Sequence, residues 1–162
     1  MIRLAAEDDL PAINAIYNHY VINTTSTAQY EAETDADRLA WFRVRGPKHP
    51  VTVYVDGDEV VGWASLSTYN KRAGYHRTVE SSVYLRHDQH RRGIGRALMQ
   101  DIMARATALG HHAVVASISG DQAPSIGLHE SLGFEKMGHL REIHRKFDRV
   151  LDVVYYVWLI PE

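Results

Sequence analysis

Apolar residues recur at helical spacing in four segments of the chain, and each segment starts or stops at a typical capping or breaking residue. In the first segment, Leu10, Ile13, Ile16 and Tyr17 fall on one helix face. The pattern predicts a first helix that follows Asp8 or Asp9 and ends near Val21, and a second that begins near Thr34 or Asp35 and stops at Gly46-Pro47. A third helix is predicted from Ile94 to Leu109, before Gly110, and a fourth from Pro124 to Leu132, before Gly133.

Between these helices, alternating or short continuous apolar runs predict strands. They cover residues 1–5, 51–55, 59–67, 78–85, 113–118, about 134–147 and 150–160, and Asp56-Gly57 is a strong hairpin turn between the second and third. The resulting order is β-α-α-β-β-β-α-β-α-β-β. The sequence therefore predicts one α/β domain over residues 1–162, built around a mixed sheet.

Composition narrows the possible partners. The 162 residues carry 18 Lys and Arg against 20 Asp and Glu, a formal net charge of −2, which argues against general nucleic-acid or membrane-surface binding. The longest apolar run, Val153 to Ile160, is far shorter than the ~20 residues of a membrane span. Acidic residues 7–9 interrupt any signal peptide, so we expect a cytoplasmic protein without membrane contact.

The chain has no cysteine, which excludes disulfides, thiolate metal sites and a cysteine nucleophile. Ten histidines keep a metal site formally possible. His87 and His90 have a spacing that suits one helix face, but Arg91 and Arg92 beside them would repel a dication. No His-Glu-x-x-His pattern occurs, so we expect no metal.

The segment Gln89 to Arg96 lies between a predicted strand and a predicted helix, and it contains Gly93 and Gly95. Glycines at such a junction let successive backbone N–H groups point into one concavity, and the helix N-terminus adds a partial positive charge. Arg91, Arg92 and Arg96 would strengthen the binding of phosphate oxygens. The alternative is a tight turn with a solvated basic face.

Two further residues are candidates for acid–base chemistry. Glu80 shares a strand face with Ser82 and Tyr84, where a partly buried carboxylate with a raised pKa would act as a general base. The alternative is a strand-end charge paired with Arg72 or Arg77. His129 lies on the short fourth helix, where a lone histidine is more often a surface or core-packing residue.

In order and spacing, these segments resemble the GCN5-related N-acetyltransferase (GNAT) superfamily, and more narrowly its phosphinothricin and methionine sulfoximine acetyltransferase branch. The resemblance covers almost the whole chain. It is carried by Ile16-Tyr17-Asn18, Trp41-Phe42, Gly62-Trp63-Ala64-Ser65-Leu66, Arg72-Ala73-Gly74-Tyr75, Thr78 to Tyr84, Leu128-His129-Glu130, Leu132-Gly133-Phe134 and Lys146-Phe147.

The resemblance implies direct acetyl transfer from acetyl-CoA to the amine of a small amino-acid analogue, in a homodimeric detoxification enzyme. Glu80 would deprotonate the acceptor, while His129 would orient the base, bind substrate or protonate the leaving thiolate. Arg72, Tyr75 and Tyr30 would bind the acceptor. The residues implied to bind acetyl-CoA are Val83, Tyr84, Leu85, Arg91, Arg92, Gly93, Ile94, Gly95, Arg96, Gln122 and Ser125.

Some positions depart from the family pattern and leave the amine open. His90 stands where Gln or Arg is usual, Gln122 replaces an Asn, and Tyr30 replaces Phe or Trp. His144, Asp148 and Val150 occupy positions that are usually Gly, Gly and Trp. Two alternatives therefore stay beside the amino-acid analogue: another amine, such as an aminoglycoside, a polyamine or a protein N-terminus, and a non-catalytic acetyl-CoA-binding module.

Overall fold

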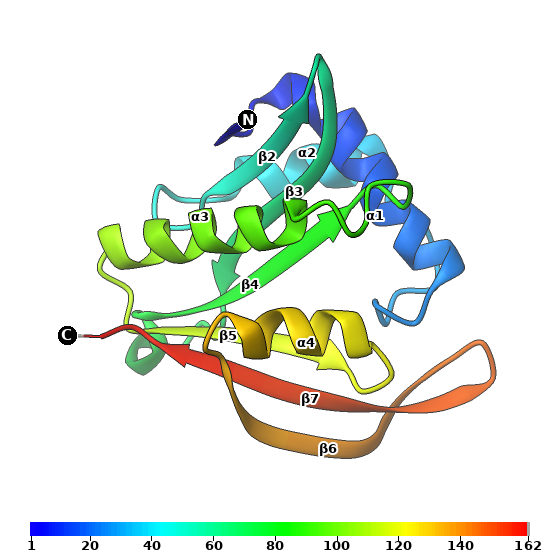
Figure 1. The fold of residues 1–162 in the computed structure, drawn as a ribbon, viewed down its shortest axis with the longest axis vertical. Helices are drawn as coiled ribbons and strands as arrows, with labels where there is room; N and C mark the ends of the chain where they lie inside the picture. The colour runs from blue at the N-terminus through cyan, green and yellow to red at the C-terminus, as the bar shows by residue number, and fades with distance from the viewer. Residues whose placement is uncertain (162) are drawn as a thin grey trace.

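The structure is a computed structural model that describes residues 1–161, and it contains one seven-stranded mixed sheet (Figure 1). The strands lie side by side in the order β1 (Ile2–Leu4), β2 (Val51–Asp56), β3 (Glu59–Thr68), β4 (Thr78–Leu85), β5 (Ala113–Ser119), β7 (Arg149–Leu159) and β6 (Glu135–Lys146). The helices are α1 (Leu10–Asn23), α2 (Asp35–Arg43), α3 (Ile94–Ala108) and α4 (Ala123–Ser131), with short 3₁₀ turns at Glu7–Asp9 and Ala73–Tyr75.

Helices cover both faces of the sheet, and each face has its own apolar core. Leu98, Met99 and Ile102 of α3 are fully buried against the central strands on one face. On the other face, Ile13 of α1 packs with Trp63 of β3. The helical spacing in the sequence places Ile13, Leu98 and Ile102 inward, and burial of these core residues drives the layered arrangement.

The strands β4 and β5 are parallel neighbours for only three residue pairs, from Thr78↔Ala113 to Glu80↔Val115. Beyond these pairs the two strands diverge, as the ribbon shows in the centre of the molecule (Figure 1). All other strand pairs are antiparallel. The divergence leaves one edge of β4 unpaired from Ser81 onward.

The element boundaries agree with the sequence pattern to within about two residues, except at the end of α2, and the predicted cap at the start of α1 does not form. Thr34 caps α2 through a reciprocal capping box with Asp37, and Gly110 follows α3 with a left-handed φ of 77°. Asp9 precedes α1, but its carboxylate binds Arg3 and the Ala6 N–H instead of capping the helix.

The second helix also ends earlier than predicted, at Arg43 and not at Gly46-Pro47. Proline disfavours the helical conformation of the residue before it, so the chain leaves the helix ahead of Pro47. Within residues 1–161, no helix has the length and apolar character needed to cross a membrane.

Candidate active site

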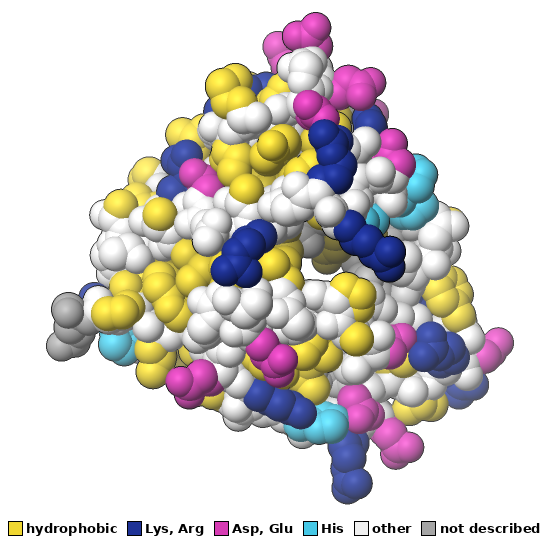
Figure 2. Space-filling model, in the orientation of Figure 1, with side chains coloured by type: hydrophobic (Ala, Val, Ile, Leu, Met, Phe, Trp, Pro, Cys, Tyr) yellow, Lys and Arg dark blue, Asp and Glu magenta, His cyan; other side chains and the backbone are white. Residues whose placement is uncertain are grey.

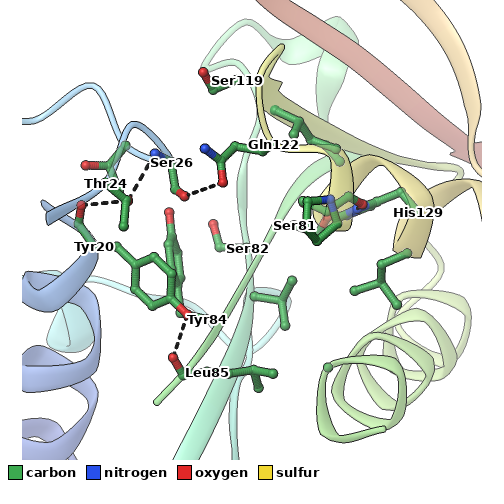
Figure 3. Close-up of a pocket in the computed structure, with 18 of the residues that line it drawn as sticks. Tyr20, Thr24, Ser26, Ser81, Ser82, Tyr84, Leu85, Ser119, Gln122 and His129 are labelled. Atoms are coloured by element: carbon green, nitrogen blue, oxygen red, sulfur yellow. Dashed lines mark hydrogen bonds between the residues drawn. The ribbon is translucent and has the colours of Figure 1, made fainter. Parts of the chain in front are cut away.

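A cavity of about 870 Å³ opens where β4 and β5 diverge. Its walls come from β4, β5, the start of α3, α4 and the segment that follows α1, as the close-up shows (Figure 3). Figure 2 shows the hollow on this face, with Lys or Arg side chains on its rim. The predicted site residues that line the cavity are Glu80, Val83, Tyr84, Leu85, Arg91, Gly95, Gln122, Ser125 and His129.

The N-terminus of α3 forms the first functional feature of the cavity. Gly93 adopts a left-handed φ of 77°, which favours glycine, and no side chain caps the helix. The first-turn N–H groups of a helix have no intrahelical acceptors, so they are available to an anion beside Gly95. This geometry supports the anion-binding turn expected from the sequence, and the binding role stays a prediction.

The three predicted phosphate-binding arginines differ in their surroundings. Arg91 lines the cavity. Arg92 forms an ion pair with Asp56 at 3.0 Å, and Arg96 donates to the Ser131 hydroxyl at 2.9 Å. The cavity is not lined by Arg92, Gly93, Ile94 or Arg96. Arg91 is therefore the arginine of this turn that brings a positive charge to the cavity.

Glu80 lies half-buried on the β4 face that also carries Tyr84, and burial raises the pKa of its carboxyl group. Within residues 1–161, Glu80 forms no ion pair with Arg72 or Arg77. Arg77 instead donates to the Gly110 carbonyl at 3.0 Å. The strand-end ion pair considered from the sequence therefore does not form, and the role of Glu80 as a general base stays a prediction.

His129 lies on α4 with only 3% of its surface exposed. Its Nδ1 is 2.8 Å from the Ser125 carbonyl oxygen, which can only accept, so Nδ1 carries the hydrogen. Burial lowers the pKa of His129, which favours the neutral ring. The ring therefore has an acceptor lone pair at Nε2.

Tyrosine rings from α1 and β4 form an aromatic wall, and of its members the sequence analysis assigned only Tyr84 to the site. Tyr84 meets Tyr17 edge-on at 5.2 Å and Tyr20 at 5.3 Å, and all three line the cavity. The Tyr20 hydroxyl donates to the Leu85 carbonyl at 2.7 Å (Figure 3). The helical spacing of Tyr17 and Tyr20 gives the only sequence signal for this wall.

Hydrogen bonds across the cavity join the segment after α1 to the start of α4. Thr25 donates to Asp121 at 2.7 Å. Ser26 donates to Gln122 at 2.9 Å, as the close-up shows (Figure 3). The Gln122 amide also donates back to Thr25 at 2.9 Å. The side chain of Gln122 thus contacts the opposite wall, where the usual Asn would be one methylene shorter.

Three predicted acceptor residues lie outside this cavity. Arg72 and Tyr75 are exposed on the β3–β4 connection. Tyr30 is 65% exposed, and its hydroxyl donates to the Arg145 carbonyl on the β6–β7 hairpin. Their acceptor-binding roles stay predictions. The described residues, 1–161, also contain no cluster of three or more His, Cys, Asp or Glu that could hold a metal ion.

Comparison with known proteins assigns the fold to a family. The profile described as "Acetyltransferase (GNAT) family" matches residues 13–134, which include every residue that lines the cavity. The chain belongs to the GNAT acetyltransferase family. It is 43% identical over 156 residues to an L-methionine sulfoximine/L-methionine sulfone acetyltransferase of Pseudomonas aeruginosa, covering 95% of this chain and 91% of the relative.

Two further GNAT relatives extend the comparison. A phosphinothricin N-acetyltransferase of Streptomyces coelicolor is 33% identical over 159 residues, covering 96% of this chain and 93% of the relative. The structure of a putative acetyltransferase from Salmonella typhimurium with its cofactor acetyl-CoA superposes with a TM-score of 0.97 and 34% identity, covering 100% and 94% of the two chains. The predicted family and α/β fold are confirmed.

Proposed function

We propose that this GNAT enzyme transfers an acetyl group from acetyl-CoA to the amino group of a small amino-acid analogue of the methionine sulfone, methionine sulfoximine or phosphinothricin type. One observation carries the proposal: a single cavity joins the N-terminus of α3 to the carboxyl group of Glu80. The acceptor class is supported by the activities for which relatives that match along nearly the whole chain are named.

Acetyl-CoA binds with its pyrophosphate at the start of α3. The free first-turn N–H groups and the charge of Arg91 support this placement. The thioester then lies in the opening between β4 and β5, where backbone N–H groups around Val83 to Leu85 polarise its carbonyl. Gln122 and Ser125 line the same cavity and complete the predicted acetyl-CoA contacts.

Transfer proceeds by direct attack, because a chain without cysteine cannot form an acyl-cysteine intermediate. Glu80 takes a proton from the acceptor ammonium, directly or through water, and the free amine attacks the thioester carbonyl carbon. The carbon–sulfur bond then breaks, the attacking nitrogen loses its second proton, and the departing thiolate takes up one proton, so that the N-acetylated product and CoA leave. The ring of His129 is neutral and has a free lone pair at Nε2, which supports a role for His129 as a hydrogen-bond acceptor during these proton transfers.

A thiol-release assay with acetyl-CoA tests the proposed function. The panel contains methionine sulfone, methionine sulfoximine, phosphinothricin, spermidine and an aminoglycoside. We expect the highest kcat/KM among the three amino-acid analogues. A preference for spermidine or the aminoglycoside would contradict the acceptor class, and no thiol release with any amine would contradict the enzymatic function.

Arg72 is proposed to bind an anionic or polar group of the acceptor through its guanidinium. We expect Arg72→Ala to raise KM for amino-acid acceptors roughly tenfold, because one charge-assisted hydrogen bond contributes about 1.5 kcal/mol. The KM for acetyl-CoA should stay unchanged, and Arg77→Ala provides a control on the same connection. Steady-state kinetics with both substrates measure the effect, and an unchanged acceptor KM would remove Arg72 from the site.

We propose a homodimer whose interface includes the outer face of β6, the edge strand of the sheet. Five apolar side chains there and on the adjoining turn and strand are between 41% and 55% exposed. These are Met137, Leu140, Ile143, Phe147 and Val150.

The dimer proposal predicts that Ile143→Asp lowers the mass in solution from that of two chains to that of one. A buried carboxylate at an apolar interface is costly to desolvate. Multi-angle light scattering after size exclusion measures the mass, and Leu4→Asp on the opposite sheet edge is the control. A wild-type protein that elutes as a monomer would contradict the proposal.

A cytoplasmic detoxification role completes the proposal. The absence of cysteine suits a reducing compartment, and acetyl-CoA is an intracellular metabolite. N-acetylation removes the positive charge of an amine and so alters how an amino-acid analogue is recognised. Recovery of the acetyltransferase activity in the cytosolic fraction, together with growth protection against methionine sulfoximine, would support this role.

A further inference from the structure

The last residue of β6, Lys146, has a buried cationic side chain that the reaction as described does not use. Its exposed fraction is only 1%, and its Nζ donates to the Thr27 carbonyl at 2.9 Å and to the Thr27 hydroxyl at 3.3 Å. No ion pair with an Asp or Glu of residues 1–161 involves Lys146. The ammonium group is therefore buried without a counter-ion from the described chain.

A buried charge without a counter-ion is costly, and burial lowers the pKa of Lys146 accordingly. An apolar side chain would fill this place without that cost. The ammonium also has three N–H donors, and Thr27 accepts only two of them. The Phe147 ring lies 5.2 Å from Nζ, but it carries no net negative charge. A ligand could therefore supply the negative charge that the described chain does not.

Thr27 connects this charge to the cavity. It lines the wall formed by the segment after α1, together with Ser26 and Ala28. Because the Thr27 hydroxyl oxygen accepts from Lys146, its hydrogen is free to be donated to another group. A hydroxyl that accepts from an ammonium is a polarised donor, which suits an anionic oxygen.

Thr27 and Lys146 lie on the side of the cavity from which the acceptor would approach Glu80. Glu80 and Tyr84 share one face of β4, and Tyr84 packs on Tyr17 of α1 on that face. The anion-binding start of α3 belongs to the core on the opposite face. An acceptor that approaches Glu80 from the α1 side therefore meets the wall that contains Thr27.

We infer that Lys146 and Thr27 together recognise the carboxylate of the acceptor, with the Thr27 hydroxyl as the donor and the Lys146 ammonium as the charge behind it. The inference rests on the proposed function and names the residues that select amino acids over plain amines. Arg72 would remain available to the polar head of the acceptor, because it is exposed and forms no ion pair within residues 1–161.

Two acceptors that differ only in this charge test the inference: methionine sulfone and its carboxamide. For Lys146→Met, which keeps a long apolar stem, we expect KM for methionine sulfone to rise roughly 10–100-fold, as for loss of a charge-assisted hydrogen bond. The KM for the carboxamide should change less than about threefold, and the KM for acetyl-CoA should not change. Lys136→Met is the matched control, since Lys136 is exposed on the same strand.

Thr27→Val decides the same question if Lys146→Met does not fold, because it keeps the side-chain shape and the carbonyl that binds Lys146. It should show the same selective loss for the carboxylate substrate. An equal loss for both acceptors would make the pair a structural clamp, and unchanged values would show that the charge is not used; either result overturns the inference. A wild-type enzyme that acetylates neither compound would overturn the proposed function as well.

Discussion

Replacing Glu80 with Gln should lower kcat at neutral pH roughly 10²–10⁴-fold, the usual contribution of a positioned general base. The amide keeps the size of the carboxyl group but cannot take a proton from the acceptor ammonium. Since burial already raises the pKa of Glu80, removing its charge should not destabilise the fold. The KM for acetyl-CoA should stay close to the wild-type value, because Glu80 lies away from the start of α3.

The pH profile separates a base from a structural carboxylate. The wild-type rate should fall as pH decreases through the raised pKa of Glu80, because the protonated acid is no longer a base. In Glu80→Gln that contribution disappears, and the deficit should shrink as pH rises towards the pKa of the amine. Glu135→Gln, at the exposed start of β6, is the control. Full activity of Glu80→Gln at about pH 7 would contradict the assignment.

Local patterns predicted the elements that carry the site because they depend on short-range chemistry. The boundaries of β4 agree with the prediction at both ends, and Thr34 and Gly110 begin and end helices as their chemistry requires. Helical and alternating apolar spacing also indicated which residues form the two cores. These features depend only on residues that are close in the sequence and on burial of one face of each element.

Features that depend on distant contacts were not predictable from the same patterns. Arg38 of α2 is only 2% exposed, although a charged side chain on a helix is usually solvated. Its guanidinium pairs with Glu33 at 2.6 Å and stacks 4.6 Å from the Trp41 ring. Aromatic faces and a nearby carboxylate make this burial tolerable, but they meet only in the folded chain.

The contacts that close the walls of the cavity also join residues that are distant in the sequence. Ser26 and Gln122 are 96 positions apart, and Lys146 reaches Thr27 across 119 positions. Sequence spacing does not encode such pairs, so Gln122 was assigned only to acetyl-CoA and Lys146 only to the family pattern. Tyr30 likewise has the residue type of an aromatic wall but lies outside the cavity.

Gly95→Asp should weaken acetyl-CoA binding by roughly 100-fold or more. Gly95 is the second residue of α3 and lines the cavity, so a carboxylate there would face the pyrophosphate at the helix N-terminus. Two like charges about 4 Å apart near a protein surface repel by about 4 kcal/mol, and each 1.4 kcal/mol corresponds to a factor of ten. The helix itself should persist, because acidic residues are favourable in the first turn.

Thermal unfolding with and without acetyl-CoA measures this effect. At 100 times Kd, a ligand stabilises the native state by about 2.7 kcal/mol, which for a domain of this size raises Tm by roughly 5–10 °C. The shift should be absent in Gly95→Asp at the same concentration.

A Cβ at Gly95 would lie 3.5 Å from Leu85 and 3.6 Å from Leu128, so Gly95→Ala fits the fold and separates bulk from charge. Gly95→Asn adds the same bulk as Asp without the charge and should retain more of the shift. A wild-type Tm that acetyl-CoA leaves unchanged would contradict binding at the α3 terminus, and an undiminished shift in Gly95→Asp would place the phosphates elsewhere.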